Sequence, residues 1–123
     1  MATINPTVTE LRDGSVKKVV YATLTTTNDV GAALPFAEWF DRTVQATGTF
    51  GTGGTVVWQG SNDGGTTWAT LRDRQGNALS FTAAALEAVD GITELARPKV
   101  TAGDGATDID ISVLCLRRTG MRT

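Results

Sequence analysis

Two runs of β-forming residues flank a turn in Val56-Val57-Trp58-Gln59-Gly60-Ser61-Asn62-Asp63-Gly64-Gly65-Thr66-Thr67-Trp68-Ala69-Thr70-Leu71, the stretch that decides the fold. Within the turn, Asn62 and Asp63 can bond their own backbone two residues further on. Gly64 and Gly65 can adopt positive φ angles without steric penalty. The stretch therefore predicts a tight β-hairpin with a tryptophan on each side of its turn, and we expect the remaining strands to be laid around it.

The same turn matches the Asp-box pattern, S-x-D-x-G-x-T-W, at every fixed position. The matching residues are Ser61, Asp63, Gly65, Thr67 and Trp68. In proteins with this motif the Asp ties the loop to its own backbone and the aromatic residue packs beneath the turn, so we expect Trp68 to be buried. The motif is structural wherever it occurs. Sialidases carry several copies on propeller blades, and one copy in a chain of 123 residues does not predict that activity.

The composition restricts the class of function. A chain of 123 residues forms one domain, here 1–123, and its 14 glycines and many threonines favour β structure with frequent turns. The net charge of −2 argues against nucleic-acid or anionic-membrane binding, which requires a basic field. No apolar run is long enough to span a membrane, and the N-terminus has no signal-peptide pattern.

The side-chain inventory offers little catalytic chemistry. The chain has no histidine, which removes the commonest general base and the commonest zinc ligand. Cys115 is the single cysteine, and its position in an apolar strand predicts a small core residue. Asp104, Asp108 and Asp110 lie near one loop without the spacing of an EF-hand, so outward carboxylates on a strand are the simpler account, with calcium as the alternative. We expect no catalytic residues, no metal, no cofactor and no small-molecule substrate, and a small hydrolase that uses carboxylates remains the enzyme alternative.

Several segments alternate as strands do. In 16–24, Val20, Ala22 and Leu24 are expected on one face, and Val19, Tyr21 and Thr23 on the other. In 43–50 and 108–118 the residues expected to point inward are Val44, Ala46, Gly48, Phe50, Ile109, Ile111, Val113 and Cys115. The only helical candidate is 82–90, and Pro98 makes 92–100 an edge strand or a bulged one. These segments predict an all-β antiparallel sandwich or jelly roll with at most one short helix, an N-terminal arm at 1–6 and a C-terminal tail at 117–123.

Two segments could meet a partner. The run 35–41 holds three aromatic residues and is either a strand or core loop or an exposed apolar patch. The tail 117–123 holds three arginines and is either solvated or a tether onto an acidic partner. The candidate partner-contact residues are Tyr21, Phe36, Trp39, Phe40, Arg117, Arg118 and Arg122.

From Asp41 to Arg118 the chain resembles a group of small tailed-bacteriophage virion proteins. The stretches that carry the resemblance are Asp41-Arg42-Thr43-Val44-Gln45-Ala46-Thr47-Gly48-Thr49-Phe50, Gly60-Ser61-Asn62-Asp63-Gly64-Gly65-Thr66-Thr67-Trp68, Gly76-Asn77-Ala78-Leu79 and Arg97-Pro98-Lys99-Val100-Thr101-Ala102-Gly103-Asp104-Gly105. Such proteins look like head decoration, or cement, proteins and other virion accessories built as β-sandwiches.

The resemblance implies a structural protein that is made in the host cytoplasm and assembled onto the capsid surface of the virion. We expect the major capsid protein as its partner, self-association as a homo-oligomer, and no enzymatic activity. A tail or neck accessory protein is one alternative. A carbohydrate-binding β-sandwich is another, and it would use exposed aromatic residues such as Trp39 or Trp58.

Overall fold

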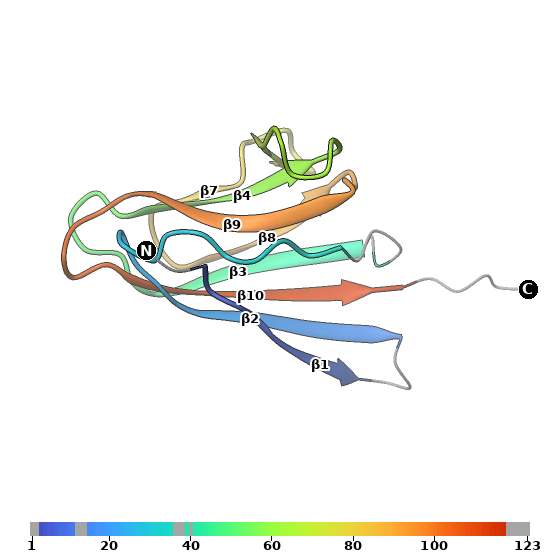
Figure 1. Ribbon diagram of the computed structural model, residues 1–123, viewed down its shortest axis with the longest axis horizontal. Helices are drawn as coiled ribbons and strands as arrows, with labels where there is room; N and C mark the ends of the chain where they lie inside the picture. The colour runs from blue at the N-terminus through green and yellow to red at the C-terminus, as the bar shows by residue number, and fades with distance from the viewer. Residues whose placement is uncertain (1–2, 12–14, 36–38, 40, 118–123) are drawn as a thin grey trace, which may run out of the picture.

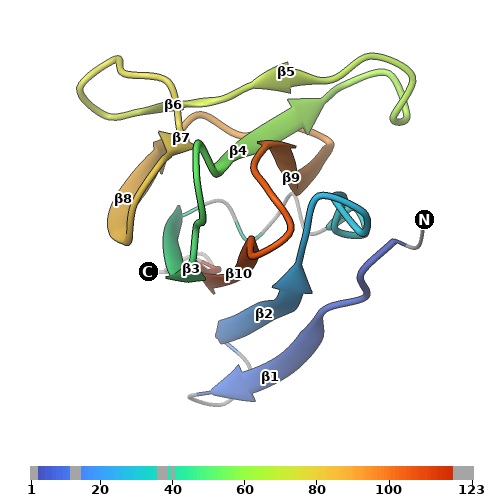
Figure 2. The same cartoon turned by 90° about the vertical axis from the view of Figure 1, so that its left-hand side faces the viewer.

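The computed structural model describes residues 3–11, 15–35, 39 and 41–117 (Figure 1). Ten strands form two antiparallel sheets that face each other (Figure 2). This arrangement confirms the predicted all-β sandwich. In the described part of the chain no helix is long and apolar enough to cross a membrane.

The larger sheet has six strands. Their order across the sheet is β1 (Thr7–Leu11), β2 (Val16–Leu24), β10 (Asp108–Leu116), β3 (Asp41–Thr49), β8 (Ala85–Asp90) and β6 (Arg72–Asp73). The chain thus places its last strand, β10, in the interior of the sheet between β2 and β3.

The smaller sheet is organised around β4 (Thr55–Ser61), the first strand of the predicted hairpin. On one side, β4 pairs with β5 (Ala69–Thr70) and with β7 (Ser80–Phe81). On its other side, β4 pairs over its whole length with β9 (Leu95–Ala102). Pro98 lies in β9, which has β4 as its only partner among the named strands, as expected for a strand at a sheet edge.

The core lies between the two sheets. Val44 and Ala46 of β3 are buried, and so are the inward residues expected of β10, Ile109, Ile111, Val113 and Cys115. From the smaller sheet, the fully buried indole of Trp58 fills the same core. Alternation of apolar and polar residues therefore predicted the inner face of β10 and that of β3 as far as Ala46 correctly. Gly48, also expected to point inward, is exposed, and Phe50 is partly buried.

The inner face of β2 differs from the prediction. Val19, Tyr21 and Leu24 are buried together, whereas Thr23 is exposed. Thr23 has a φ of 63°, and the register between β2 and β10 shifts at this point. This irregularity inserts one residue into β2, so that the strand's inward set changes parity after Tyr21.

The predicted helix at 82–90 is wrong. Residues 85–90 form β8, which pairs with β3 from Thr43 opposite Ala88 to Ala46 opposite Ala85. A single short helix is marginal in isolation, and pairing with β3 supplies backbone hydrogen bonds and burial that the alanine-rich sequence alone does not.

The segment before β3 closes the free side of β9. Val30 bridges to Lys99 and Leu34 to Ala96, and the Gly31 N–H donates to the Pro98 carbonyl at 3.0 Å. The expected N-terminal arm joins this segment, since Ile4 bridges to Gly31. No side chain fits at Gly31, because a Cβ there would lie 2.6 Å from the Tyr21 ring.

Candidate interaction surface

The Asp-box turn is held by its own side chains. The Ser61 hydroxyl donates to the Asp63 carboxylate at 2.7 Å and accepts the Gly65 N–H at 3.0 Å. Asp63 in turn accepts the Thr67 N–H at 2.9 Å. These hydrogen bonds, the one from the Thr67 backbone foremost, lower the pKa of Asp63 from 3.8 to about 2. The motif therefore acts here as a structural turn, as expected.

Trp68 is half-buried, and the prediction of a buried side chain is wrong. Its indole N–H donates to the Gly65 carbonyl at 2.9 Å, so the ring does pack beneath the turn. The guanidinium of Arg97 covers the ring at 4.0 Å from its centroid, and the Arg97 Nε donates to Gln59 at 3.0 Å. The ring is thus covered by a cation–π contact at the surface rather than by the core.

Two residues that stabilise this turn had no signal in the sequence. Glu94 accepts the Gly64 N–H at 2.9 Å, and its own N–H donates to Asn62 at 2.8 Å. Arg97 reaches Trp68 because β9 pairs with β4, with Gln59 opposite Arg97. The hydrogen bonds of these two residues span 30 to 38 positions of the chain, and only strand pairing brings them to the turn.

The outward face of the larger sheet is the broadest candidate for contact with a partner. The register places Leu114 of β10 between Lys18 and Thr43 of the flanking strands. One row further along, Ser112 lies opposite Gln45, which in turn lies opposite Leu86 of β8. We call the surface formed by these residues and by Val16, Asp41 and Leu116 the outer face.

Apolar side chains are exposed on the outer face. Leu86 is 59% exposed and Leu114 is 45% exposed. Two hollows of about 330 and 220 Å³ lie beside these leucines, and both are lined by Thr43 and Leu114. Exposed leucines beside hollows on one sheet face are typical of a surface that another protein covers.

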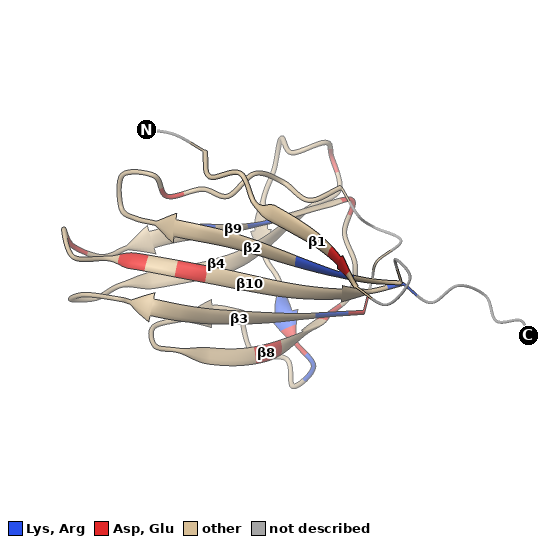
Figure 3. Ribbon diagram, turned by 90° about the horizontal axis from the view of Figure 1, so that it is seen from below, with Lys and Arg blue, Asp and Glu red and all other residues tan. Residues whose placement is uncertain are grey.

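Charged residues are sparse in the middle of the outer face. Figure 3 shows β2, β10 and β3 with their lysine, arginine, aspartate and glutamate positions mainly toward the strand ends. In β10, Asp108 and Asp110 precede the uncharged run from Ile111 to Leu116. Asp110 accepts the Thr23 N–H at 3.0 Å, which ties one carboxylate to the irregularity in β2.

Two of the predicted partner-contact residues are in the core, so those two predictions are wrong. Tyr21 is fully buried, and its hydroxyl donates to the Ala32 carbonyl at 2.6 Å. Trp39 is only 4% exposed, with Lys17 at 4.6 Å and Arg117 at 4.9 Å from its ring centroid. Aromatic rings of this size are buried where the core has room for them.

The other predicted contact residues are either exposed or outside the described residues. Arg117 is exposed and remains a candidate for contact. Phe36, Phe40, Arg118 and Arg122 lie outside the described residues. Trp39 and Trp58, the aromatic residues given as examples for the carbohydrate-binding alternative, are both buried.

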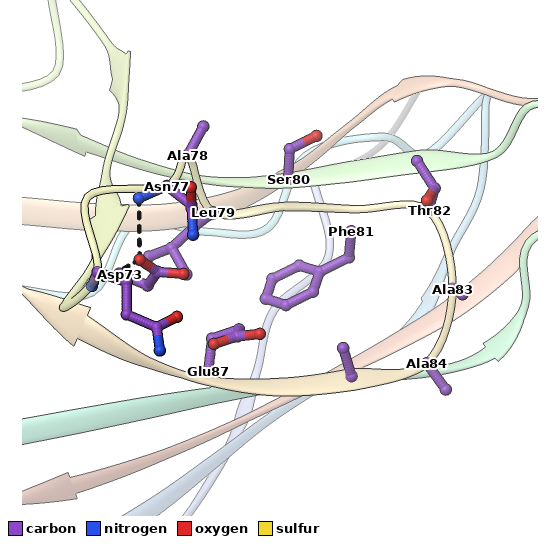
Figure 4. Close-up of a pocket in the computed structure, with 12 residues that line it drawn as sticks. Asp73, Asn77, Ala78, Leu79, Ser80, Phe81, Thr82, Ala83, Ala84 and Glu87 are labelled. Atoms are coloured by element: carbon purple, nitrogen blue, oxygen red, sulfur yellow. Dashed lines mark hydrogen bonds between the residues drawn. The ribbon is translucent and has the colours of Figure 1, made fainter.

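A pocket of about 320 Å³ lies between the turn that follows β6 and the start of β8 (Figure 4). Phe81 and Glu87 point into it. Asp73 at its edge accepts the N–H groups of Gln75 and Asn77, both at 2.9 Å, and so fixes the turn. The lining residues contain no nucleophile paired with a base, and the pocket does not support a catalytic assignment.

The acidic loop at 104–110 is likewise structural. Asp104 accepts the N–H groups of Thr52 and Ala106, both at 2.9 Å, and these hydrogen bonds lower its pKa. Over the part of the chain that the structure describes, no group of three histidine, cysteine or acidic side chains is placed to hold a metal ion. Asp104 thus fixes the backbone around Thr52.

Comparison of this chain with protein-family models, curated proteins and solved structures gives no match. The outer face, rather than a relative, therefore provides the starting point for a functional argument. It combines exposed leucines, few charges and a rigid sheet beneath them.

Proposed function

We propose that this protein is a structural component of a bacteriophage virion that binds the outside of the assembled head through the outer face. The observation that carries the proposal is the exposure of Leu86 and Leu114 on one sheet face with few charges. The resemblance of 41–118 to small phage virion proteins supplies the class of partner, the major capsid protein.

The chemistry of the outer face fits a protein partner. Burying the exposed parts of the two leucines and the uncharged polar side chains beside them is favourable. Lys18, which lies opposite Leu114, would have to keep its ammonium group in water or meet an acidic group of the partner. The absence of histidine from the sequence fits the same structural role. Many copies on one lattice would multiply a weak contact through avidity.

Binding of this kind would strengthen a head. A protein that binds the assembled lattice but not its separate subunits stabilises the assembly by linkage. We therefore expect heads that carry the protein to retain DNA to a higher temperature than heads that lack it. The proposal needs no catalytic step.

The test compares the Leu86→Lys/Leu114→Lys double variant with the wild type on purified heads that lack the protein. Both leucines are exposed in the structure, so lysine should be tolerated in the free protein, which thermal melting would verify. We expect the double variant to lose binding and to leave the temperature of DNA release unchanged. Thr70→Lys, which adds one lysine to an exposed residue of the smaller sheet, is the control and should bind as the wild type does.

Two results would contradict the proposal. In one, the double variant binds heads as tightly as the control. In the other, wild-type protein is found in purified tails or necks and not in heads, which would favour the accessory-protein alternative.

A further inference from the structure

Among the described residues, β1 is the strand whose outer side is open along its whole length, whereas β8 is open only before Val89, where its pairing with β6 begins. Beyond β9, the edge of the smaller sheet is closed by the bridges of Val30 and Leu34. On the opposite side the chain passes directly from β5 to β6, and the turn after β6 folds back through a bridge between Arg72 and Ala78. Figure 2 shows this crossing at one end of the larger sheet and β1 alone at the other end.

β1 has a single neighbour in the described structure. It pairs with β2 from Thr7 opposite Val20 to Leu11 opposite Val16, and no described strand lies on its other side. All five of its residues are exposed, and Val8 and Leu11 are 41% and 39% exposed. The strand therefore contributes little to the core, although it presents a row of backbone donors and acceptors.

Natural proteins protect such edges with lysine, proline, bulges or very short strands. Within Thr7–Leu11 there is no lysine and no proline, although Pro6 directly precedes the strand, and the only charge in the strand is that of Glu10. Lys17 of β2 approaches that carboxylate to 2.7 Å, so the charge is already paired within the chain. The edge of β1 is thus open to pairing.

We propose that two copies of this chain pair through β1, antiparallel and across a two-fold axis, with Val8 opposite Val8 of the second copy. A second copy is the occupant because a two-fold axis at this edge pairs residues 7–9 of both open edges with one contact. The pairing uses the outer side of β1, beside which no described strand lies. The pairing does not rest on the proposed function.

Side-chain chemistry selects the register. A pair centred on Val8 brings two valines together and places Thr7 opposite Thr9 of the second copy, and both are favourable cross-strand pairs. In this register Thr7–Thr9 of the two strands pair with each other, and Glu10 of each copy lies opposite Pro6 of the other, just before β1. The two Glu10 carboxylates then lie four residues apart along the pair, about 14 Å. A register centred on Glu10 would place two carboxylates opposite each other, and one centred on Thr9 would place Val8 beside Glu10.

The pairing has a consequence for the outer face. A two-fold axis perpendicular to the sheet leaves the outer faces of both copies on the same side of one continuous sheet. Such a dimer could therefore contact a lattice at two places at once, and this consequence alone rests on the proposed function.

Sedimentation of the full chain across micromolar to millimolar concentrations tests the pairing. We expect the wild type to form a dimer, and we expect Val8→Lys and Val8→Glu each to be monomeric, because like charges would lie directly opposite each other. An equal mixture of the two variants should restore the dimer, which also shows that both are folded. Leu86→Lys on the far side of the sheet is the control and should remain dimeric.

A cross-linking experiment tests the register. Under oxidising conditions the Val8→Cys variant should form a disulfide-linked dimer rapidly, since directly opposite Cβ atoms lie about 4.5–5.5 Å apart. The Thr9→Cys variant is the matched control and should cross-link much more slowly, because the two substituted residues would not be opposite each other.

Three results would overturn the inference: a monomeric wild type throughout the concentration range, a dimer that Val8→Lys does not weaken, or equal cross-linking by the two cysteine variants. None of them depends on heads. A monomer that still binds heads through the outer face would refute the pairing and leave the proposed function standing, whereas a dimer that does not bind heads would do the reverse.

Discussion

Truncating two residues of β10 on opposite sheet faces tests which of its faces points into the core. Ile111 is 1% exposed and Leu114 is 45% exposed, and both lie between β2 and β3 in the sheet. The changes Ile111→Ala and Leu114→Ala remove the same number of carbon atoms. A difference in their effects on stability therefore reports burial and not side-chain size.

The magnitudes follow from the two environments. For Ile111, the removed atoms lose a transfer free energy of about 0.8 kcal/mol per carbon, and a cavity remains in a tightly packed core, so we expect a loss of about 3–4 kcal/mol. For Leu114, roughly half of the side chain already contacts water and no closed cavity forms. We expect the Leu114→Ala variant to lose about 1 kcal/mol.

Urea unfolding of both variants at one protein concentration provides the measurement. The midpoints should separate widely while the slope of the unfolding free energy against urea stays that of the wild type. The reasoning would be refuted by an equal or larger loss for Leu114→Ala. Because a shift of one residue reverses every side chain of a strand, that result would place Leu114 inside and remove the outer face as described.

Four further measurements test individual contacts. The pKa of Asp63 is lowered to about 2 in the folded protein, so its contribution to stability is complete above the unfolded pKa near 3.8 and is lost as the pH falls toward 2. When the unfolding free energy is measured between those two pH values, the Asp63→Asn variant should lose less of it than the wild type does. Trp68→Ala should lower the unfolding free energy by about 2 kcal/mol, less than for a fully buried tryptophan, and a loss of about 4 kcal/mol in chemical denaturation would mean that the ring is buried. Tyr21→Phe should lose about 1–2 kcal/mol in the same assay, because the Ala32 carbonyl loses its donor, and an unchanged midpoint would contradict that hydrogen bond. Burial raises the pKa of the Cys115 thiol, so a thiol reagent should label it only after denaturation, and rapid labelling of the native protein would place this face of β10 at the surface.

Local patterns in the sequence determined much of the fold. Alternation in 43–50 and 108–118 identified the buried sides of β3 and β10, because successive residues of a strand point to opposite sheet faces. The Asp-box turn was equally predictable, since each of its hydrogen bonds joins residues within a few positions of one another. Leu114 could be assigned to the outward side of its strand for the same reason.

Only the tertiary structure decided the features that depend on distant segments. Ala85–Asp90 has helix-forming residues and becomes a strand because β3 pairs with it, and that change brings Leu86 to the outer face. The irregularity at Thr23 reverses the end of β2, and β9 delivers Arg97 to Trp68. Tyr21 and Trp39, which the sequence offered as candidates for partner contact, fill the core in the structure. In each case the deciding free energy comes from packing or pairing between residues far apart in the chain, which a local pattern does not contain.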